Sequence, residues 1–216
     1  MSFLRPMMVC LLLLLLAGTA VAAPHHGYYA GAWFGISTFD TSKASDDLGS
    51  FNLEADDGSW WGVSFGYDLP SQRSGSNGRV EFEYSDRSNS FNRGQFSNGD
   101  FAASGDVRVE SLMLNSFAVF PNRTRVSPYL GLGIGGAQLT VDQLQIDGQP
   151  FIDDDCMTFA WQVGVGLDFA VTSYLRVDLG YRYFSAYQPE LTEVDGRKVN
   201  LDYATHNGLL GLVWMF

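Results

Sequence analysis

Beyond residue 22 the sequence lacks any run of the ~18 consecutive apolar residues that a membrane-spanning helix requires. It is nevertheless rich in apolar residues, which make up 46% of the chain, and 14% of the residues are aromatic. Glycine is also frequent, with 24 residues spread along the chain. Apolar residues that are abundant but not gathered in long runs must alternate with other residues, and such alternation is typical of β-strands.

Cysteine and basic residues are scarce. The two cysteines are Cys10 and Cys156. Cys10 lies in a segment that we expect to be removed, so no intramolecular disulfide is expected. Only 13 residues are lysine or arginine, against 24 aspartates and glutamates, and the net charge is −11. This charge argues against a nucleic-acid partner, because binding to phosphates needs clustered basic residues.

The first 22 residues have the features of a signal peptide. Arg5 precedes an apolar stretch at residues 9–16, and small residues follow it up to Ala22. The apolar stretch is too short to span a bilayer comfortably. We therefore expect export, cleavage of residues 1–22 before Ala23, and a single domain over residues 23–216.

Eight segments show a two-residue period, in which apolar side chains alternate with glycine or polar ones. Their apolar rows occupy residues 28–36, 61–69, 80–84, 112–120, 130–134, 159–169, 175–183 and 208–216. Segments of this kind match the ~9–11 tilted residues with which a β-strand crosses a bilayer. In hydrocarbon every backbone group must pair internally, so strands that cross a membrane must close into a barrel without an edge.

The less apolar face of these segments distinguishes a membrane barrel from a soluble one. It carries glycines together with side chains that we predict to form a network in the barrel lumen: Glu81, Glu83, Asn115, Gln162, Asp168, Arg176, Asp178 and Arg182. A soluble barrel or sandwich would instead place its charges outside and its apolar face inside. The sequence thus predicts an all-β fold, an eight-stranded antiparallel transmembrane up-and-down β-barrel, with a soluble sandwich or cup as the alternative.

Within this network we expect Glu81 and Glu83 to pair with Arg176 and Arg182 across the barrel. An eight-stranded barrel encloses room only for side chains or one small ligand. A polar plug is therefore favoured over a conducting pore.

The connections between the segments alternate in length. Four long polar loops are predicted at residues 39–58, 86–106, 142–155 and 187–201, and three short turns at 70–77, 121–127 and 171–173. Long loops on one side and short turns on the other are typical of outer-membrane barrels, with the long loops facing out.

Three stretches and the final segment share a pattern with one family. They are GYYAG at residues 27–31, PYLGLG at 128–133, LRVDLGYRY at 175–183 and GLLGLVWMF at 208–216. Together they resemble the OmpA/OmpX-like and opacity-type family of small outer-membrane β-barrels. The resemblance implies the bacterial outer membrane as location. It also implies a signal for the outer-membrane assembly machinery, formed by Leu210, Leu212, Trp214 and Phe216. It implies little about activity, because members of this family share a fold more than a function.

Patterns that can indicate catalysis or ligand binding have simpler interpretations here. Gly131, Gly133 and Gly136 have the spacing of a dinucleotide fingerprint, but they lie within a strand and no helix follows. The acidic run 153–155 is interpreted as a solvated loop, with cation bridging to lipopolysaccharide phosphates as the alternative. His206 lacks the nearby serine of lipid-A deacylases and is placed on the lipid side. We expect no catalytic, cofactor-binding or metal-binding residue.

The favoured function is a non-enzymatic outer-membrane scaffold that displays acidic loops and serves membrane integrity, adhesion or host interaction. Its expected partners are outer-membrane lipid and lipopolysaccharide, the assembly machinery and host surface molecules. Two alternatives stay open. One is a narrow porin for small solutes, which conductance would reveal. The other is an enzyme that modifies lipid A, which a change in the mass of lipid A would reveal.

Overall fold

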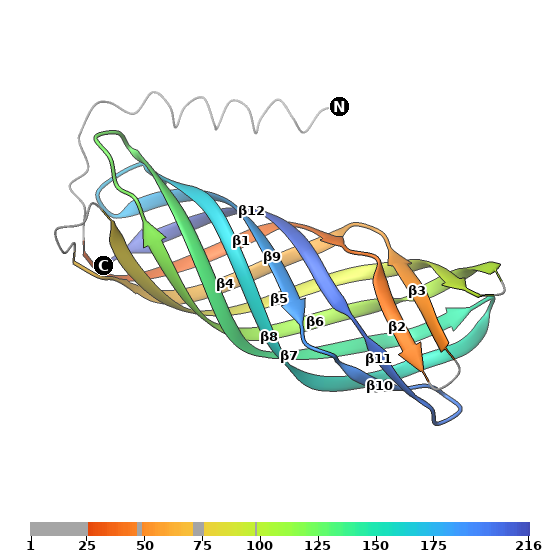
Figure 1. Ribbon diagram of the computed structural model, residues 1–216. Coiled ribbons are helices and arrows are strands. Elements are labelled where there is room, and N and C mark those ends of the chain that lie inside the picture. Colours follow the sequence, from red (N-terminus) through yellow and green to blue (C-terminus); the bar gives the residue numbers. More distant parts are fainter. Residues whose placement is uncertain (1–25, 47–48, 71–75, 98) are drawn as a thin grey trace, which may run out of the picture.

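The computed structural model describes residues 26–46, 49–70, 76–97 and 99–216 (Figure 1). The predicted signal peptide, with Cys10 and the cleavage before Ala23, lies outside these residues. In the described part of the chain no helix is both long and apolar enough to cross a bilayer. The elements are antiparallel strands, and they form two rings that share four of their strands.

The first ring, here the basal ring, contains eight strands. They are β1 (Gly27–Phe39), β4 (Gly58–Asp68), β5 (Asn77–Phe96), β6 (Gly99–Val119), β7 (Val126–Ile146), β8 (Gln149–Ala170), β9 (Leu175–Ala186) and β12 (Tyr203–Met215). β1 pairs with β12 from Tyr29 opposite Met215 to Phe39 opposite Thr205, and this ladder closes the ring. The predicted eight-stranded antiparallel barrel is confirmed.

The second ring, here the distal ring, lies at the end of the molecule away from the carboxyl terminus (Figure 1). β5, β6, β7 and β8 have 20 to 22 residues each and continue into it. There they join four short strands, β2 (Ser42–Asp46), β3 (Gly49–Ala55), β10 (Glu190–Thr192) and β11 (Lys198–Leu201). The ladder runs β10-β11-β2-β3-β5, and a single bridge between Ile152 and Glu193 joins β8 to β10.

The distal ring corrects the prediction of four long polar loops. The segments at 39–58, 86–106 and 142–155 are largely strand, and the segment at 187–201 contains the two short strands β10 and β11. They also have a two-residue period, with buried residues such as Leu53, Phe91 and Leu144 on the inner face. Their outward positions are rich in aspartate, serine and asparagine, and this polar composition concealed the period. The predicted short turns at 121–127 and 171–173 are confirmed. The turn at 70–77 lies largely outside the described residues.

The polarity of the wall reverses between the two rings, as β7 shows. In the basal ring Leu130 and Leu132 are exposed on the outer face, and glycines face inward. Farther along the strand, in the distal ring, Leu139 and Val141 are buried inside and Gln138 is exposed outside. The basal ring is therefore apolar outside and polar inside, whereas the distal ring has the arrangement of a soluble barrel.

Two girdles of aromatic side chains bound the apolar outer face of the basal ring. The girdle at the turn end contains Tyr28, Tyr67, Tyr174 and Trp214, and the other contains Trp61, Tyr84, Trp161, Tyr183 and His206. Aromatic girdles mark the two interfaces of an outer-membrane barrel, whose apolar band is ~25 Å tall. The 22 residues of β8, at ~3.3 Å each and a tilt of ~40°, rise about 55 Å. About half of the molecule therefore stands outside the hydrocarbon.

We expect the substitution Val165→Arg to destabilise the folded barrel by about 2–4 kcal/mol, because Val165 lies near the middle of the lipid-facing band. Val165 is 49% exposed on β8, between Trp161 and Phe169 in the outward row. Val194→Arg is the matched control, since Val194 is 64% exposed but belongs to the distal ring region. Urea unfolding in lipid vesicles measures both. Equal losses at the two positions would contradict the assignment of the membrane band.

Candidate functional site

The lumen of the basal ring contains all eight residues predicted to form a network. Seven of them are buried: Glu81, Glu83, Asn115, Gln162, Asp168, Asp178 and Arg182. Arg176 is partly buried, with 15% of its side chain exposed. Because inward residues alternate along β5, β6, β8 and β9, the strands themselves place these side chains on the lumen face. The structure divides them into a central cluster and a turn-end cluster, with Asp178 separate.

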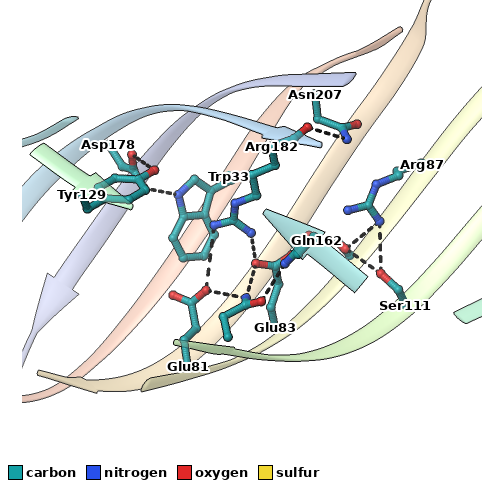
Figure 2. A network of polar contacts seen from close by, with 12 residues as sticks. Trp33, Glu81, Glu83, Arg87, Ser111, Tyr129, Gln162, Asp178, Arg182 and Asn207 are labelled. Carbon is teal, nitrogen blue, oxygen red and sulfur yellow. Dashed lines mark hydrogen bonds and ion pairs between the residues drawn. The ribbon is translucent and has the colours of Figure 1, made fainter. Parts of the chain in front are cut away.

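The central cluster is built around the carboxylates of Glu81 and Glu83 (Figure 2). Arg182 donates a hydrogen bond to Glu83 through Nη1, and its Nη2 lies 3.9 Å from Oε1 of Glu81. Asn115 Nδ2 donates to both carboxylates, at 3.1 Å and 3.0 Å. Gln162 Nε2 donates to Asn115 at 2.7 Å and lies 3.4 Å from Glu83 Oε1. One guanidinium and two amides thus stabilise two buried acids.

The turn-end cluster pairs two aspartates with two arginines. Arg79 donates to Asp68 at 2.8 Å and to Asp168 at 2.5 Å. Arg176 also binds Asp68, and its Nη1 lies 3.6 Å from Asp168. The expected pairing of Arg176 with Glu81 or Glu83 is therefore replaced by pairing with aspartates. The reason is distance along the strand, because the six residues from Arg176 to Arg182 span ~20 Å, so the two arginines occupy different levels of the barrel.

Neutral donors complete the site. Trp33 Nε1 and Tyr129 Oη donate to the two carboxylate oxygens of Asp178, at 2.9 Å and 2.8 Å. Tyr29 Oη donates to Glu81 at 2.8 Å. Each of these aromatic residues therefore satisfies a buried acid and fills the lumen at the same time.

Arg87 lies where the polar lumen meets the apolar core of the distal ring. Its Nη1 donates to Ser85 at 3.0 Å and Ser111 at 3.1 Å, and its guanidinium lies 3.9 Å from the centre of the Phe184 ring. Among the described residues, no carboxylate lies within ion-pair distance of it. Stacking on an aromatic face stabilises such a buried cation.

Sequence reasoning missed Asp68, Arg79 and Arg87, as well as the aromatic donors. Arg79 and Arg87 stand on the same parity as Glu81 and Glu83 in β5, so that parity could have identified both. Asp68 follows the alternation of β4 in the same way. Tyr29 and Trp33 stood on the minority face of the first segment. These large aromatic residues stand among small and polar neighbours, and aromatic side chains are expected to face lipid, so they were not assigned to the lumen network.

The glycines that resembled a dinucleotide motif make room for large side chains of the lumen. A Cβ atom at Gly131 would overlap the ring of Phe117, and one at Gly133 would overlap the amide of Asn115. Both glycines lie within β7, as predicted. Glycine is needed here because large lumen residues of the neighbouring strand β6 lie directly over the backbone of β7.

Other residues considered at the sequence level lie outside the lumen network. The acids at 153–155 alternate along β8 and have separate hydrogen bonds, such as Asp154 with the Thr192 amide at 2.7 Å. In the described part of the chain no three histidine, cysteine or acidic residues are arranged to hold a metal ion. His206 faces outward and contacts Tyr181. Burial, with Asp154 and Asp155, raises the pKa of the Cys156 thiol to about 11, so that it is a poor nucleophile at neutral pH.

The residues proposed as an assembly signal lie in and after β12. Leu212, Trp214 and Phe216 are exposed on the outer face, and Leu210 is half-buried in the same row. The amide of Phe216 donates to the Tyr28 carbonyl at 3.0 Å, which continues the pairing of β12 with β1. The alternating apolar row is thus part of the closing ladder.

A closed barrel with an apolar outer band, aromatic girdles and a lumen of ion pairs defines the class of outer-membrane β-barrel proteins. The chain belongs to the outer membrane protein beta-barrel domain family, whose model matches residues 7–216. Its location is accordingly the bacterial outer membrane.

Comparison with individual proteins agrees with this assignment. The chain is 26% identical to the outer membrane protein PagN of Salmonella typhimurium over 202 residues. The aligned region covers 82% of this chain and 82% of PagN. The fold is similar to that of the outer membrane protein OprG from Pseudomonas aeruginosa, with a TM-score of 0.63, 13% identity, and coverage of 91% of this chain and 100% of that one. It is also similar to Neisserial surface protein A, with a TM-score of 0.53, 21% identity, and coverage of 88% and 97%.

Proposed function

We propose that the protein is a non-conducting, non-enzymatic surface scaffold, in which the basal ring anchors a rigid acidic distal ring outside the membrane. The observation that carries this proposal is the change of polarity between the two rings. A barrel that served only as an anchor would not need four strands of 20 to 22 residues and a second apolar core. Such a rigid extension is suited to presenting a surface to the outside.

The distribution of acidic residues also supports a surface role for the distal ring. Five acids lie in the basal lumen, and the other 19 of the 24 fall in residues 40–57, 86–110, 142–155 and 190–202, which form or adjoin the distal ring. These ranges contain six basic residues. A surface of such charge repels anionic molecules and stays soluble, and it favours partners with basic patches or bound cations. We propose membrane integrity, adhesion and contact with host surface molecules as the roles that this ring serves.

The filled lumen weighs against the narrow-porin alternative. The basal lumen contains buried ion pairs and aromatic side chains, and the distal ring adds an apolar core above them. A solute would have to cross both layers. Against lipid-A chemistry, the half-buried Cys156 has a raised pKa and His206 is paired with a tyrosine on the outer face. The assembly machinery, outer-membrane lipid and lipopolysaccharide complete the proposed partners.

We expect the purified, folded protein to be nearly silent in a planar lipid bilayer, because two layers of side chains close the barrel. Current recordings across a range of voltages, with a known porin as positive control, provide the measurement. If the wild-type protein forms stable discrete channels, the scaffold function is wrong and the narrow-porin function is supported. A change in the mass of lipid A in cells that overproduce the protein would instead support the enzyme.

A further inference from the structure

One layer of the barrel interior contains several buried polar atoms that have no hydrogen-bond partner among the described residues. This layer lies where the polar lumen meets the apolar core of the distal ring. Trp60 is the cross-strand neighbour of Arg87, and its ring lies 5.8 Å from the guanidinium carbon of Arg87 and 5.6 Å from that of Arg182. The atoms are Nε and Nη2 of Arg87, Nε1 of Trp60, Nε of Arg182, Oε1 of Gln162 and Oδ1 of Asn207.

Most of these atoms are hydrogen-bond donors. Four of the six are arginine or tryptophan nitrogens, which can only donate, and two are amide oxygens. A buried donor without an acceptor destabilises the folded state. A water molecule brings donors as well as acceptors, so it matches this set poorly. An anion accepts several hydrogen bonds and donates none, and it therefore matches the set better.

Arg87 adds a positive charge that no described acid contacts. Its side chain is fully buried, and arginine stays charged even when it is buried. In Figure 2 the dashed lines from Arg87 lead to serine hydroxyls and not to a carboxylate. Asp86, the preceding residue of β5, lies on the outward parity and pairs with Arg108 at 2.5 Å. The central cluster has two acids for one guanidinium, but Glu83 lies four residues from Arg87 along β5, or ~13 Å.

The position in the barrel limits the ligand to a small ion. An eight-stranded barrel has room only for side chains or one small ligand. The aromatic rings of Trp60 and Phe184 also flank the guanidinium of Arg87. A hydrogen-bonded ion lies ~3 Å from its donor, so one ion can reach both a guanidinium nitrogen and the indole nitrogen of Trp60. A halide ion accepts hydrogen bonds from any direction and is smaller than a phosphate.

We propose that the barrel binds a small inorganic anion of the size of chloride between Arg87 and Trp60. The ion accepts hydrogen bonds from the guanidinium of Arg87 and from the indole of Trp60, and it compensates the buried charge. It is taken up as the barrel closes, because side chains of the lumen lie below it and the apolar core of the distal ring lies above it. The inference does not rest on the scaffold function, since a barrel of any function could contain this ion.

The first experiment measures urea unfolding of the protein in lipid vesicles. One series contains sodium chloride, and the other contains sodium gluconate, whose anion is too large for the lumen, at the same ionic strength. A ligand that binds only the folded state lowers the unfolding equilibrium constant by a factor of 1 + [L]/Kd, so each tenfold rise in chloride above Kd should lower it about tenfold. Arg87→Met should abolish this dependence on chloride. Arg176→Met is the matched lumen control and should keep it, because Arg176 pairs with aspartates at the turn end.

The second experiment locates the ion directly and does not depend on the folding of any variant. Crystals of the wild-type protein folded in sodium bromide should show an anomalous bromide peak within hydrogen-bond distance of Arg87 and Trp60. Bromide at the protein surface alone would mean an adventitious ion only and would overturn the proposal. Equal stability in chloride and gluconate, or a chloride dependence that persists in Arg87→Met, would also overturn it, and water would then be the partner of these donors.

Discussion

Replacing Arg182 with methionine should lower the free energy of unfolding of the barrel by about 3–5 kcal/mol, because two buried acids then lose their guanidinium partner. Glu83 and Arg182 are both almost fully buried, and Glu81 lies 3.9 Å from the same side chain. Methionine keeps much of the packing against Trp33, whose ring lies 5.4 Å from the guanidinium. The loss therefore reports mainly the uncompensated charge. Urea unfolding in lipid vesicles provides the measurement.

A double-mutant cycle makes this prediction specific. The substitution Glu83→Gln in the Arg182→Met chain should restore part of the stability, since it removes one of the two orphaned acids and its amide oxygen still accepts one of the hydrogen bonds that Asn115 and Gln162 donate. Arg176→Met is the matched control and should cost less, because Asp68 and Asp168 retain Arg79. If Arg176→Met and Arg182→Met cost the same, or if Glu83→Gln adds to the loss, the central cluster does not depend on this ion pair.

The second large effect should follow from Leu139→Asp, which places a charge in the apolar core of the distal ring. Leu139 is fully buried there and belongs to a continuous cluster with Val107, Val141 and Leu191. The charge has no basic partner in that cluster, and burying an unpaired charge costs several kcal/mol. We expect the distal ring to open while the basal ring stays folded, because the basal ring is closed by its own ladder between β1 and β12.

Limited proteolysis of intact cells distinguishes the two rings. In the Leu139→Asp variant an added protease should cleave β5 to β8 within the distal ring and leave a membrane-protected fragment with heat-modifiable mobility. Thr140→Asp is the control, since Thr140 stands on the outward parity of β7, opposite Arg108 of β6. Resistance of the Leu139→Asp protein to cleavage, or equal sensitivity of the Thr140→Asp protein, would show that the apolar core does not hold the distal ring closed.

The two-residue period by itself determined which side chains face the lumen and which face lipid. It assigned Val165 to the lipid and Gln162 to the lumen, and the structure places both accordingly. This works because alternate residues of a strand point to opposite faces whatever the strand pairs with. The same period was present in the distal strands, where Leu144 and Ile152 face inward. There the polar outward residues made the segments resemble loops.

Tertiary structure alone decided which lumen residues meet. Arg182 and Glu83 are 99 residues apart in the chain, and Arg79 and Asp168 are 89 apart. Their meeting depends on the level that each residue reaches in the closed ring, which follows from the pairing register of every strand between them. The distal ring also depends on tertiary structure. The four long strands are completed by β1, β4, β9 and β12 in the basal ring, and by β2, β3, β10 and β11 in the distal ring. A local alternation specifies faces, whereas partners across a barrel are set by the closure of the whole sheet.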